Sequence, residues 1–469
     1  MAKRSLETDY LVVGAGAMGM AFTDALIDHA DVHVTLVDRR HAPGGHWLDA
    51  YPFVQLHQAS VFYGVASTVL GGGVQSEGPE AGLHERARRA EICEYYDDVL
   101  RRRFLPSGKV AFLGNGEYYA DGSLHLVTSR LTGETSELRV RRRVVDAAYL
   151  APTIPATTPP PFAVADDLRV ATVNDLAALD RTPSRYVIVG SGKTGTDAII
   201  WLLREGVAAD RIVWVRPRDP WMLDRAVVQP DPLVALGLGA NTMEAAAAAS
   251  SPDDFFLRLE AAGVMLRIDE NVVPTMARAP TLARWELELL RTIENVVRLG
   301  HVRRATRRGL ILDRGELPLE PDALVVHCAA AGLRQPPLVP IWGSDVIRLQ
   351  TIRAGFPCFC AALAGYVEAT RDDDRERNRL CPPNAYANTT ADWALMQLRG
   401  TLATRSYGSE PDIARWANGC ALNPARIEAS RREDPAVRAA AARAAGSVDA
   451  ALASLAEMLE EPPTASDHA

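Results

Sequence analysis

Two segments of the chain share one pattern of apolar and glycine positions. Each starts with an apolar run and continues with glycines at the spacing G-x-G-x-x-G: 10–13 with Gly14, Gly16 and Gly19, and 186–189 with Gly190, Gly192 and Gly195. A short continuous apolar run predicts a buried strand of a parallel sheet. The residues that follow, 21–27 and 197–203, have helical character. The pattern therefore predicts the same strand, turn and helix twice.

The glycine spacing indicates what these turns bind. A pyrophosphate lies on a helix N-terminus only where the turn is tight and no side chain blocks its approach, so that backbone N–H groups contact it. One copy is a weak signal, because glycine turns are common, but two copies with suitable strands and helices are stronger. We expect an α/β fold with two Rossmann-like dinucleotide-binding domains, a helical insertion and a helical C-terminal segment.

The residues after the first unit support a nucleotide site. The apolar run 32–37 ends at Asp38, about 20 residues past Gly19, where a carboxylate accepts hydrogen bonds from an adenosine ribose and repels a 2′-phosphate. Gly44, Gly45 and Trp47 follow shortly afterwards. The alternative is an ordinary glycine turn beside a core tryptophan.

The second unit differs from the first at the corresponding strand end. Arg216 and Arg218 stand there, about 20 residues past Gly195. Two guanidinium groups at this place suit the 2′-phosphate of NADPH. The alternative is that both arginines are solvated. A phosphate-loop NTPase is excluded, because Val187 occupies the place of its first glycine.

Together these motifs resemble those of the flavin-containing monooxygenases and related two-dinucleotide flavoproteins. In that family an acidic residue, a basic stretch and Gly-Gly-x-Trp lie along FAD, and G-x-G-x-S-G-x-D binds NADPH; Thr194 replaces the serine here. The resemblance implies FAD contacts from Gly14, Ala15, Gly16, Gly19, Asp38, Arg39, Gly45, His46 and Trp47, with Gln350 at the flavin edge. It implies NADPH contacts from Gly190, Gly192, Lys193, Thr194, Gly195, Arg216 and Arg218.

The resemblance also implies an activity. Relatives oxidise small organic molecules at nitrogen, sulfur or ketone groups with molecular oxygen, through a flavin peroxide. Their hallmark Phe-x-Gly-x-x-x-His would begin at Phe162, but Val164 and Leu168 replace the glycine and the histidine. Two alternatives therefore stay open: a flavin dehydrogenase or reductase without oxygen transfer, and a dinucleotide-binding regulator without turnover.

Two residues are candidates for catalysis. Gln58 stands where many relatives carry an asparagine near the flavin, so its amide is expected to donate a similar hydrogen bond. His57 is a candidate for proton transfer near neutral pH. The alternative for His57 is a structural role.

A proline-rich segment and the order of the motifs predict the domain boundaries. The proline-rich segment 152–161 reads as a linker, because proline continues neither a helix nor a central strand. We expect four parts: a first FAD-binding part at 1–151, an NADPH-binding domain at 162–320 with a helical insertion at about 221–297, a second FAD-binding part at 321–400, and a helical extension at 401–469 for packing or dimerisation.

Composition excludes several classes. The length of 469 residues fits about three units, and the net charge of −8 argues against nucleic-acid or anionic-membrane partners. Neither a signal peptide nor a membrane span is expected. The six cysteines lack zinc or redox spacing, so we expect no metal and a reducing cytoplasm.

Overall fold

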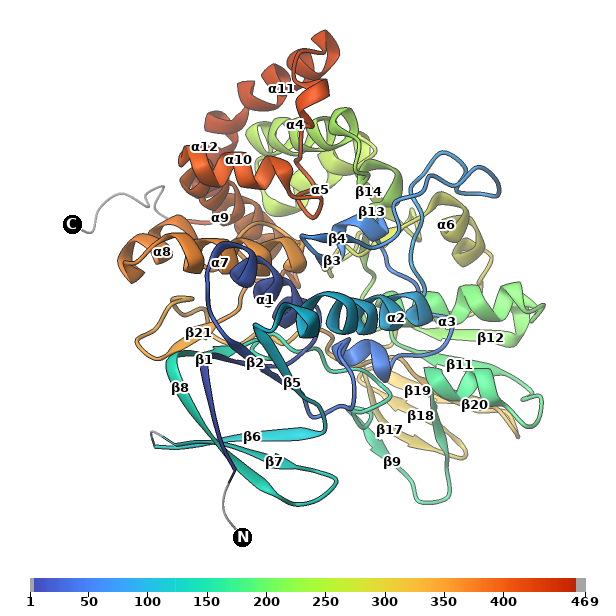
Figure 1. The fold of residues 1–469 in the computed structure, drawn as a ribbon. Coiled ribbons are helices and arrows are strands. Elements are labelled where there is room, and N and C mark those ends of the chain that lie inside the picture. Colours follow the sequence, from blue (N-terminus) through green and yellow to red (C-terminus); the bar gives the residue numbers. More distant parts are fainter. Residues whose placement is uncertain (1–3, 123, 461–469) are drawn as a thin grey trace.

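A mixed sheet built around the first glycine motif forms one half of the computed structural model, which describes residues 4–122 and 124–460 (Figure 1). The seven-stranded sheet has the order β5-β2-β1-β8-β7-β6, with β21 pairing β8. Its strands are β1 (Arg4–Val13), β2 (Val34–Val37), β5 (Val110–Leu113), β6 (Gly116–Asp121), β7 (Leu124–Ser129), β8 (Thr135–Asp146) and β21 (Val346–Arg348). They pair in parallel except at β6–β7 and β7–β8, which are antiparallel. Helices α1 (Ala17–His29) and α7 (Pro357–Thr370) pack together in its core, and α2 (Arg89–Val99) adds to it.

A second sheet, which is parallel, contains the other glycine motif. Its order is β10-β20-β11-β12-β16, formed by β10 (Val170–Thr172), β11 (Tyr186–Val189), β12 (Ile212–Val215), β16 (Val296–Val297) and β20 (Leu324–His327). Helix α3 (Lys193–Arg204) follows β11, as α1 follows β1. The two expected Rossmann-like units are therefore present, and in each the apolar residues before the first glycine are buried: 10–12 in β1 and 186–189 in β11.

One expected domain boundary is corrected by this sheet. Residue 321 was expected to start the return to the first domain, but β20 pairs with β10 and β11 of the second sheet. The chain rejoins the first sheet only at β21. Because β20 is short and apolar, its sequence suits either sheet, and only pairing decides the assignment.

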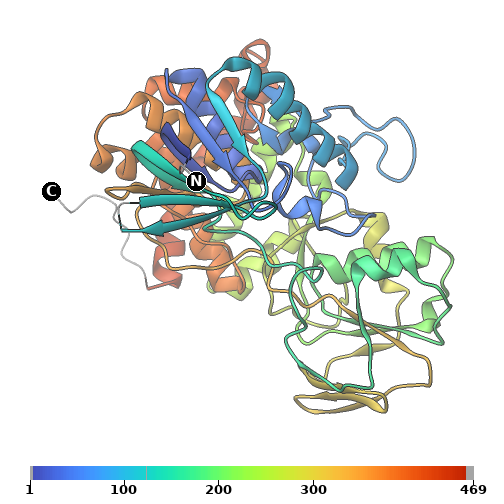
Figure 2. The same cartoon turned by 60° about the horizontal axis from the view of Figure 1, so that its bottom comes forward.

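A small mixed sheet covers the outer face of the second one. It has the order β19-β18-β17-β9, formed by β9 (Ala163–Val164), β17 (Val302–Thr306), β18 (Gly309–Leu312) and β19 (Gly315–Pro318). In it β9 is parallel to β17, and the other pairs are antiparallel. Its apolar residues share a core with β11 and β12. Figure 2 shows these two sheets as a separate lobe at the lower right.

The insertion is mixed and not purely helical as expected. It holds α4 (Pro232–Ala248), α5 (Pro252–Ala261) and α6 (Arg284–Arg291), but also the three-stranded sheet of β13 (Trp221–Asp224), β14 (Met265–Arg267) and β15 (Thr281–Leu282). Helix α6 ends at Arg291, before the expected end of the insertion at about residue 297, and β16 joins the second sheet. Helix α4 begins where Asp231 accepts hydrogen bonds from the N–H groups of Leu233 and Val234.

The C-terminal helices pack on the insertion of the same chain. They are α8 (Asp374–Leu380), α9 (Thr390–Gly408), α10 (Pro411–Gly419), α11 (Pro435–Gly446) and α12 (Val448–Met458). Helices α11 and α12 contact α4, so segments far apart in sequence share one apolar core (Figure 1). The expected boundary at residue 401 falls inside α9, and residues 461–469 of the expected extension lie outside the described residues.

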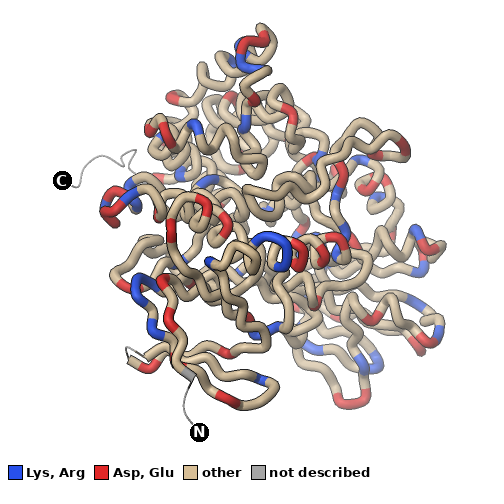
Figure 3. The backbone as a smooth tube through the Cα atoms, viewed as in Figure 1, with Lys and Arg blue, Asp and Glu red and all other residues tan. Residues whose placement is uncertain are grey.

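The surface carries both signs of charge. Basic and acidic residues are interspersed along the described chain (Figure 3). Within 4–122 and 124–460, no helix combines the length and apolarity needed to cross a bilayer.

Candidate dinucleotide and substrate site

One cavity of about 1290 Å³ contacts both glycine motifs. Its lining includes Gly14 and Asp38 after strands of the first sheet, and Gly190, Pro217 and Cys328 after strands of the second. Ligands of open parallel sheets bind outside the carboxyl ends of the strands. The cavity therefore lies where two dinucleotides would meet.

The first motif needs its glycines for two different reasons. Gly14 has a φ of +107°, which makes the tight turn after β1. A Cβ on Gly19 would lie 1.9 Å from the carbonyl oxygen of Gly14, so Gly19 allows α1 to pack against the strand. A Cβ on Gly45 would lie 3.0 Å from the Cα of Gly16. The two glycine turns thus touch, and they leave room for a ligand only beside their backbones.

Asp38 is held at the edge of this turn. Its Oδ2 accepts the N–H of Ala15 at 2.8 Å, and its Oδ1 accepts the N–H of Arg40 at 2.8 Å. Ala15 itself is buried and contributes backbone to this bond. A carboxylate has four lone-pair sites, so Asp38, which lines the cavity with Arg39, can still accept from a ribose.

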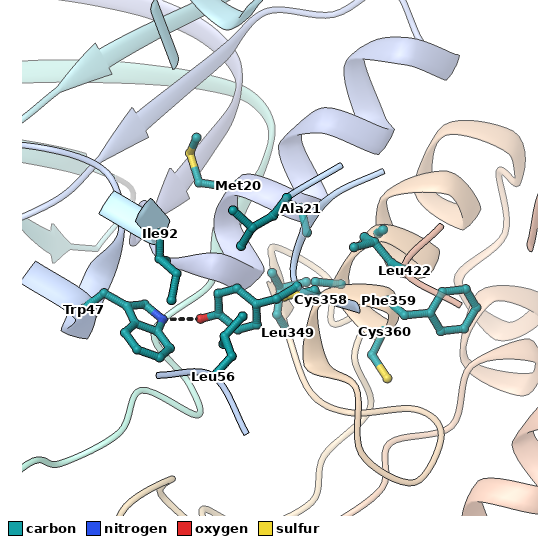
Figure 4. Close-up of a cluster of buried hydrophobic side chains, with 14 of the residues drawn as sticks. Met20, Ala21, Trp47, Leu56, Ile92, Leu349, Cys358, Phe359, Cys360 and Leu422 are labelled. Carbon is teal, nitrogen blue, oxygen red and sulfur yellow. Dashed lines mark hydrogen bonds between the residues drawn. The ribbon is translucent and has the colours of Figure 1, made fainter. Parts of the chain in front are cut away.

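Trp47 and His46 form the adjoining wall. The Trp47 indole donates to the Tyr63 hydroxyl at 2.6 Å (Figure 4), which fixes its ring at the cavity. Burial, and then the nearby Arg40 guanidinium, lower the pKa of His46 to about 4. His46 is therefore neutral near pH 7.

The second motif repeats the geometry of the first. Gly190 has a φ of +132°, and a Cβ on Gly195 would lie 2.3 Å from the Gly190 carbonyl oxygen. A Cβ on Gly192 would meet open space, and Gly192 lines the cavity together with Lys193 and Thr194. Backbone N–H groups at this helix start are thereby accessible to a phosphate.

Lys193 belongs to a contact between the two domains. Its ammonium pairs with Asp197, and Asp197 also accepts the Tyr51 hydroxyl at 2.6 Å. Tyr51 follows the Gly-Gly turn of the first domain, and Phe53 stacks on Trp201 of α3 with centroids 4.5 Å apart. The sequence motif placed Lys193 at the cavity but gave no sign of this contact.

The expected arginine pair is corrected at one member. Arg216 is only 1% exposed, pairs with Asp219 at 2.7 Å and stacks over Trp214, and it does not line the cavity. Its role is structural, because its guanidinium forms an ion pair with Asp219, three residues later. Arg218 does line the cavity.

Arg218 instead has a partner that the sequence did not indicate. Arg218 Nη2 and Arg278 Nε both donate to Asn388 Oδ1, at 3.0 and 3.1 Å. Burial, and then Arg218, lower the pKa of Arg278. No carboxylate pairs with either guanidinium in the described part of the chain, so the two cations form a site for an anion.

The expectation for Gln350 is also wrong. Its side chain is buried, its Nε2 donates to the Val339 carbonyl oxygen at 2.8 Å, and it does not line the cavity. The neighbouring Gly355, Phe356 and Pro357 line it instead. Phe356 has a φ of +54°, a strained conformation for a bulky residue, and directs the start of α7 to the cavity.

The two catalytic candidates lie together, and the surroundings of His57 lower its pKa. Both His57 and Gln58 line the cavity. Burial, and then the cations Lys193 and Arg86, hold the pKa of His57 well below its usual value. His57 is thus neutral near pH 7, and its part in proton transfer stays a prediction.

Sequence reasoning missed the helical wall of the cavity. Leu238 and Met243 of α4, and Met396 and Gln397 of α9, line it. No local motif marks these residues, since the wall exists only when helices from distant segments pack. Among the described residues, no cluster of His, Cys, Asp or Glu could hold a metal ion.

Comparisons with known proteins agree with the first domain and add relatives. Residues 12–65 match the family model described as an NAD(P)-binding Rossmann-like domain. Uncharacterized proteins of Mycobacterium tuberculosis and Mycobacterium bovis are 42% identical over 424 residues, covering 90% of this chain and 78% of theirs. The chain belongs to their family.

Solved structures resemble the chain in general architecture. A polycyclic ketone monooxygenase from the fungus Thermothelomyces thermophila is 13% identical, covers 95% of this chain and 89% of its own, and gives a TM-score of 0.48. A bacillithiol disulfide reductase from Bacillus cereus is 14% identical, covers 78% of this chain and 100% of its own, and gives 0.47. Similarity at this level gives no argument about activity.

Proposed function

We propose that this protein is an FAD- and NADPH-dependent oxidoreductase that transfers oxygen to an apolar organic molecule. One observation carries the proposal: two dinucleotide turns from different sheets open on a single cavity. Electron transfer between two dinucleotides requires both in one enclosure, with their reacting ends held close together.

The first site fits FAD. Gly14, Gly16 and Gly45 line the cavity without side chains, Asp38 suits a ribose, and Trp47 offers an aromatic wall. The start of α7 brings the positive end of a helix to the same cavity. Bound FAD would supply the acceptor for a hydride from NADPH and the electrons for oxygen.

The second site fits NADPH. The backbone at Gly192 and Lys193 would hold the pyrophosphate. Arg218 and Arg278 would hold the 2′-phosphate in place of the expected pair of Arg216 and Arg218. The carboxylate at the first strand end would disfavour a 2′-phosphate, whereas the two cations near the second would favour one. The two sites would therefore select different dinucleotides.

Oxygen transfer is supported by the rest of the lining. Beyond the turns the cavity is mostly apolar, with Leu238, Met243 and Met396 among its walls. With both dinucleotides and a substrate bound, apolar walls of this kind would keep water out and protect reactive species. Neutral His57 and Gln58 would supply hydrogen bonds there without adding charge.

Purified protein tests the proposal directly. We expect a yellow protein that releases FAD on denaturation, identified by mass spectrometry, and that oxidises NADPH only with flavin bound. With a true substrate and ¹⁸O₂, labelled oxygen should appear in the product. A colourless protein that FAD does not reconstitute would contradict the proposal. Electron transfer without labelled product would favour a dehydrogenase or reductase.

A further inference from the structure

The cavity extends beyond both glycine turns into a distal chamber. We define this chamber by Leu238 and Met243 of α4, Met396 and Thr404 of α9, Val448 of α12, and Arg353 before α7. It opens on the start of α7, where Phe356 lies against Phe62 with centroids 5.2 Å apart. A molecule in this chamber would have one end beside the proposed flavin site.

The chamber is closed by the C-terminal helices of the same chain. Arg443 of α11 donates to Glu244 of α4 at 2.6 and 2.8 Å, and to Asn241 at 2.7 Å. Leu455 of α12 belongs to the same apolar core as Met243. The chamber wall is therefore a packed part of the fold.

Arg353 is a charged residue in otherwise neutral surroundings. Its Nη1 donates to the neutral Asn423 Oδ1 at 3.2 Å, and its guanidinium lies 5.4 Å from the Phe356 ring centroid and 6.0 Å from that of Phe359. Its Nε is buried without a hydrogen-bond partner. Within residues 4–122 and 124–460, no carboxylate forms an ion pair with Arg353.

An arginine without a carboxylate partner and with a buried Nε is suited to bind an anion. Burial of a charge costs free energy unless an opposite charge compensates it, and a guanidinium pairs carboxylates in two parallel hydrogen bonds. The cavity lining also holds Asp38, Arg39, Arg40, Glu117, Lys193, Arg218, Arg278 and Arg334, of which Asp38, Lys193, Arg218 and Arg278 are assigned above to the two dinucleotide sites. Arg353 is thus available to bind an anionic group of a different ligand.

We propose that the distal chamber binds an apolar carboxylic acid, with its carboxylate on Arg353 and its hydrocarbon body along α4 and α9. As an assignment of the substrate class, the inference rests on the proposed function. A protonated amine would meet a like charge here, so the chamber disfavours substrates oxidised at a basic nitrogen. A neutral molecule would leave Arg353 uncompensated.

Three probes of equal chain length test the assignment: dodecanoate, dodecan-1-ol and protonated dodecylamine. Their dissociation constants are measured by titration calorimetry on the full-length protein at neutral pH, without NADPH. We expect dodecanoate to bind at least about tenfold more tightly than the alcohol, and the amine most weakly. Equal affinity for dodecanoate and dodecan-1-ol, or no binding of any probe, would overturn the assignment.

Variants locate the binding group. Arg353→Gln should weaken dodecanoate at least about tenfold and leave dodecan-1-ol unchanged, whereas Arg353→Lys should retain most of the preference for the acid. Arg307→Gln, at an exposed arginine, is the matched control and should change neither affinity. An unchanged dodecanoate affinity in a folded Arg353→Gln protein would contradict the role of Arg353.

Failure of this inference is distinguishable from failure of the proposed function. A yellow, NADPH-oxidising protein without a preference for dodecanoate would remove the acid assignment alone. A colourless protein that binds dodecanoate through Arg353 would keep the anion site and remove the flavin chemistry.

Discussion

At the scale of single residues, neighbouring positions of one binding motif have different physical roles. Gly192 meets open space at the cavity, whereas Gly195 touches the carbonyl oxygen of its own turn. Arg216 and Arg218 are two positions apart, yet one is buried on Asp219 and the other faces the cavity. A motif names positions, and the contacts of each position decide whether it serves binding or packing.

Two glycine variants should separate these roles. Gly192→Ala is expected to raise the KM for NADPH and leave the unfolding temperature unchanged, because its Cβ blocks only the phosphate approach. Gly195→Ala should lower the unfolding temperature, since its Cβ would lie 2.3 Å from the Gly190 oxygen. Steady-state kinetics and thermal unfolding measure both. Identical behaviour of the two variants would be evidence against the distinction.

Arginine variants should show which pair selects NADPH. Arg218→Gln and Arg278→Gln should each raise the KM for NADPH by about tenfold or more, with little change for NADH, because only NADPH carries the 2′-phosphate. Arg216→Gln should instead lower stability, since buried Asp219 loses one of its two cations. A loss of NADPH selectivity in Arg216→Gln without a stability change would restore the sequence prediction.

The pKa of His46 should make stability depend on pH. The folded state holds it at about 4, whereas the unfolded chain has the ordinary value of about 6.5. Below that value the unfolded state binds more protons, so the free energy of unfolding should fall as the pH drops from about 6.5 to about 4. Urea unfolding of His46→Gln should show a smaller fall, and the exposed His41→Gln should not. A pH dependence that His46→Gln leaves intact would assign it to other groups.

At the scale of elements, buried charges fasten the insertion to the first domain. Arg86 pairs with Glu80 and with Glu286 of α6 at 3.1 Å, and all three are nearly buried. Arg225, after β13, pairs with the same Glu80 at 3.1 Å. The position of α6 therefore depends on a loop that is distant in sequence.

Removal of the shared cation should be costly. Arg86→Met would leave two carboxylates buried with reduced compensation, and we expect the free energy of unfolding to fall by about 3–5 kcal/mol. Arg101→Met, at an exposed pair with Asp97, should cost less than about 1 kcal/mol. Urea denaturation of both variants measures the contrast, and equal small losses would show that this cluster contributes little.

At the scale of the whole molecule, two sheets and a helical wall enclose one cavity. The Tyr51 hydroxyl on Asp197 and the stack of Phe53 on Trp201 join the two domains beside it. Helices α4, α9, α11 and α12 close its far side. The relative placement of the two dinucleotides thus follows from contacts outside both glycine motifs.

Tyr51→Phe should test this placement. Loss of the hydroxyl leaves Asp197 paired with Lys193, so both domains should stay folded with unchanged NADPH affinity. We expect the rate of flavin reduction at saturating NADPH to fall, because the two ligands are aligned less well. Stopped-flow absorbance measures the rate. An unchanged rate would show that other contacts set the alignment.

The sequence by itself determined both nucleotide units, their glycine turns and the place of Asp38 and Trp47. These features follow from local rules, since apolar periodicity and backbone conformation depend on neighbours in the chain. The same rules left the insertion incompletely described, because short strands such as β13 and β15 carry no distinct signal.

Only the tertiary structure decided which arginines form an anion site, where β20 belongs and what encloses the substrate end of the cavity. Arg278, Asn388 and Arg353 stand in segments without motifs, and their meaning comes from groups that folding brings near them. Burial and pairing also reversed the expectations for Arg216 and Gln350. Charge compensation and hydrogen bonding are properties of three-dimensional neighbours, and the order of residues along the chain does not specify them.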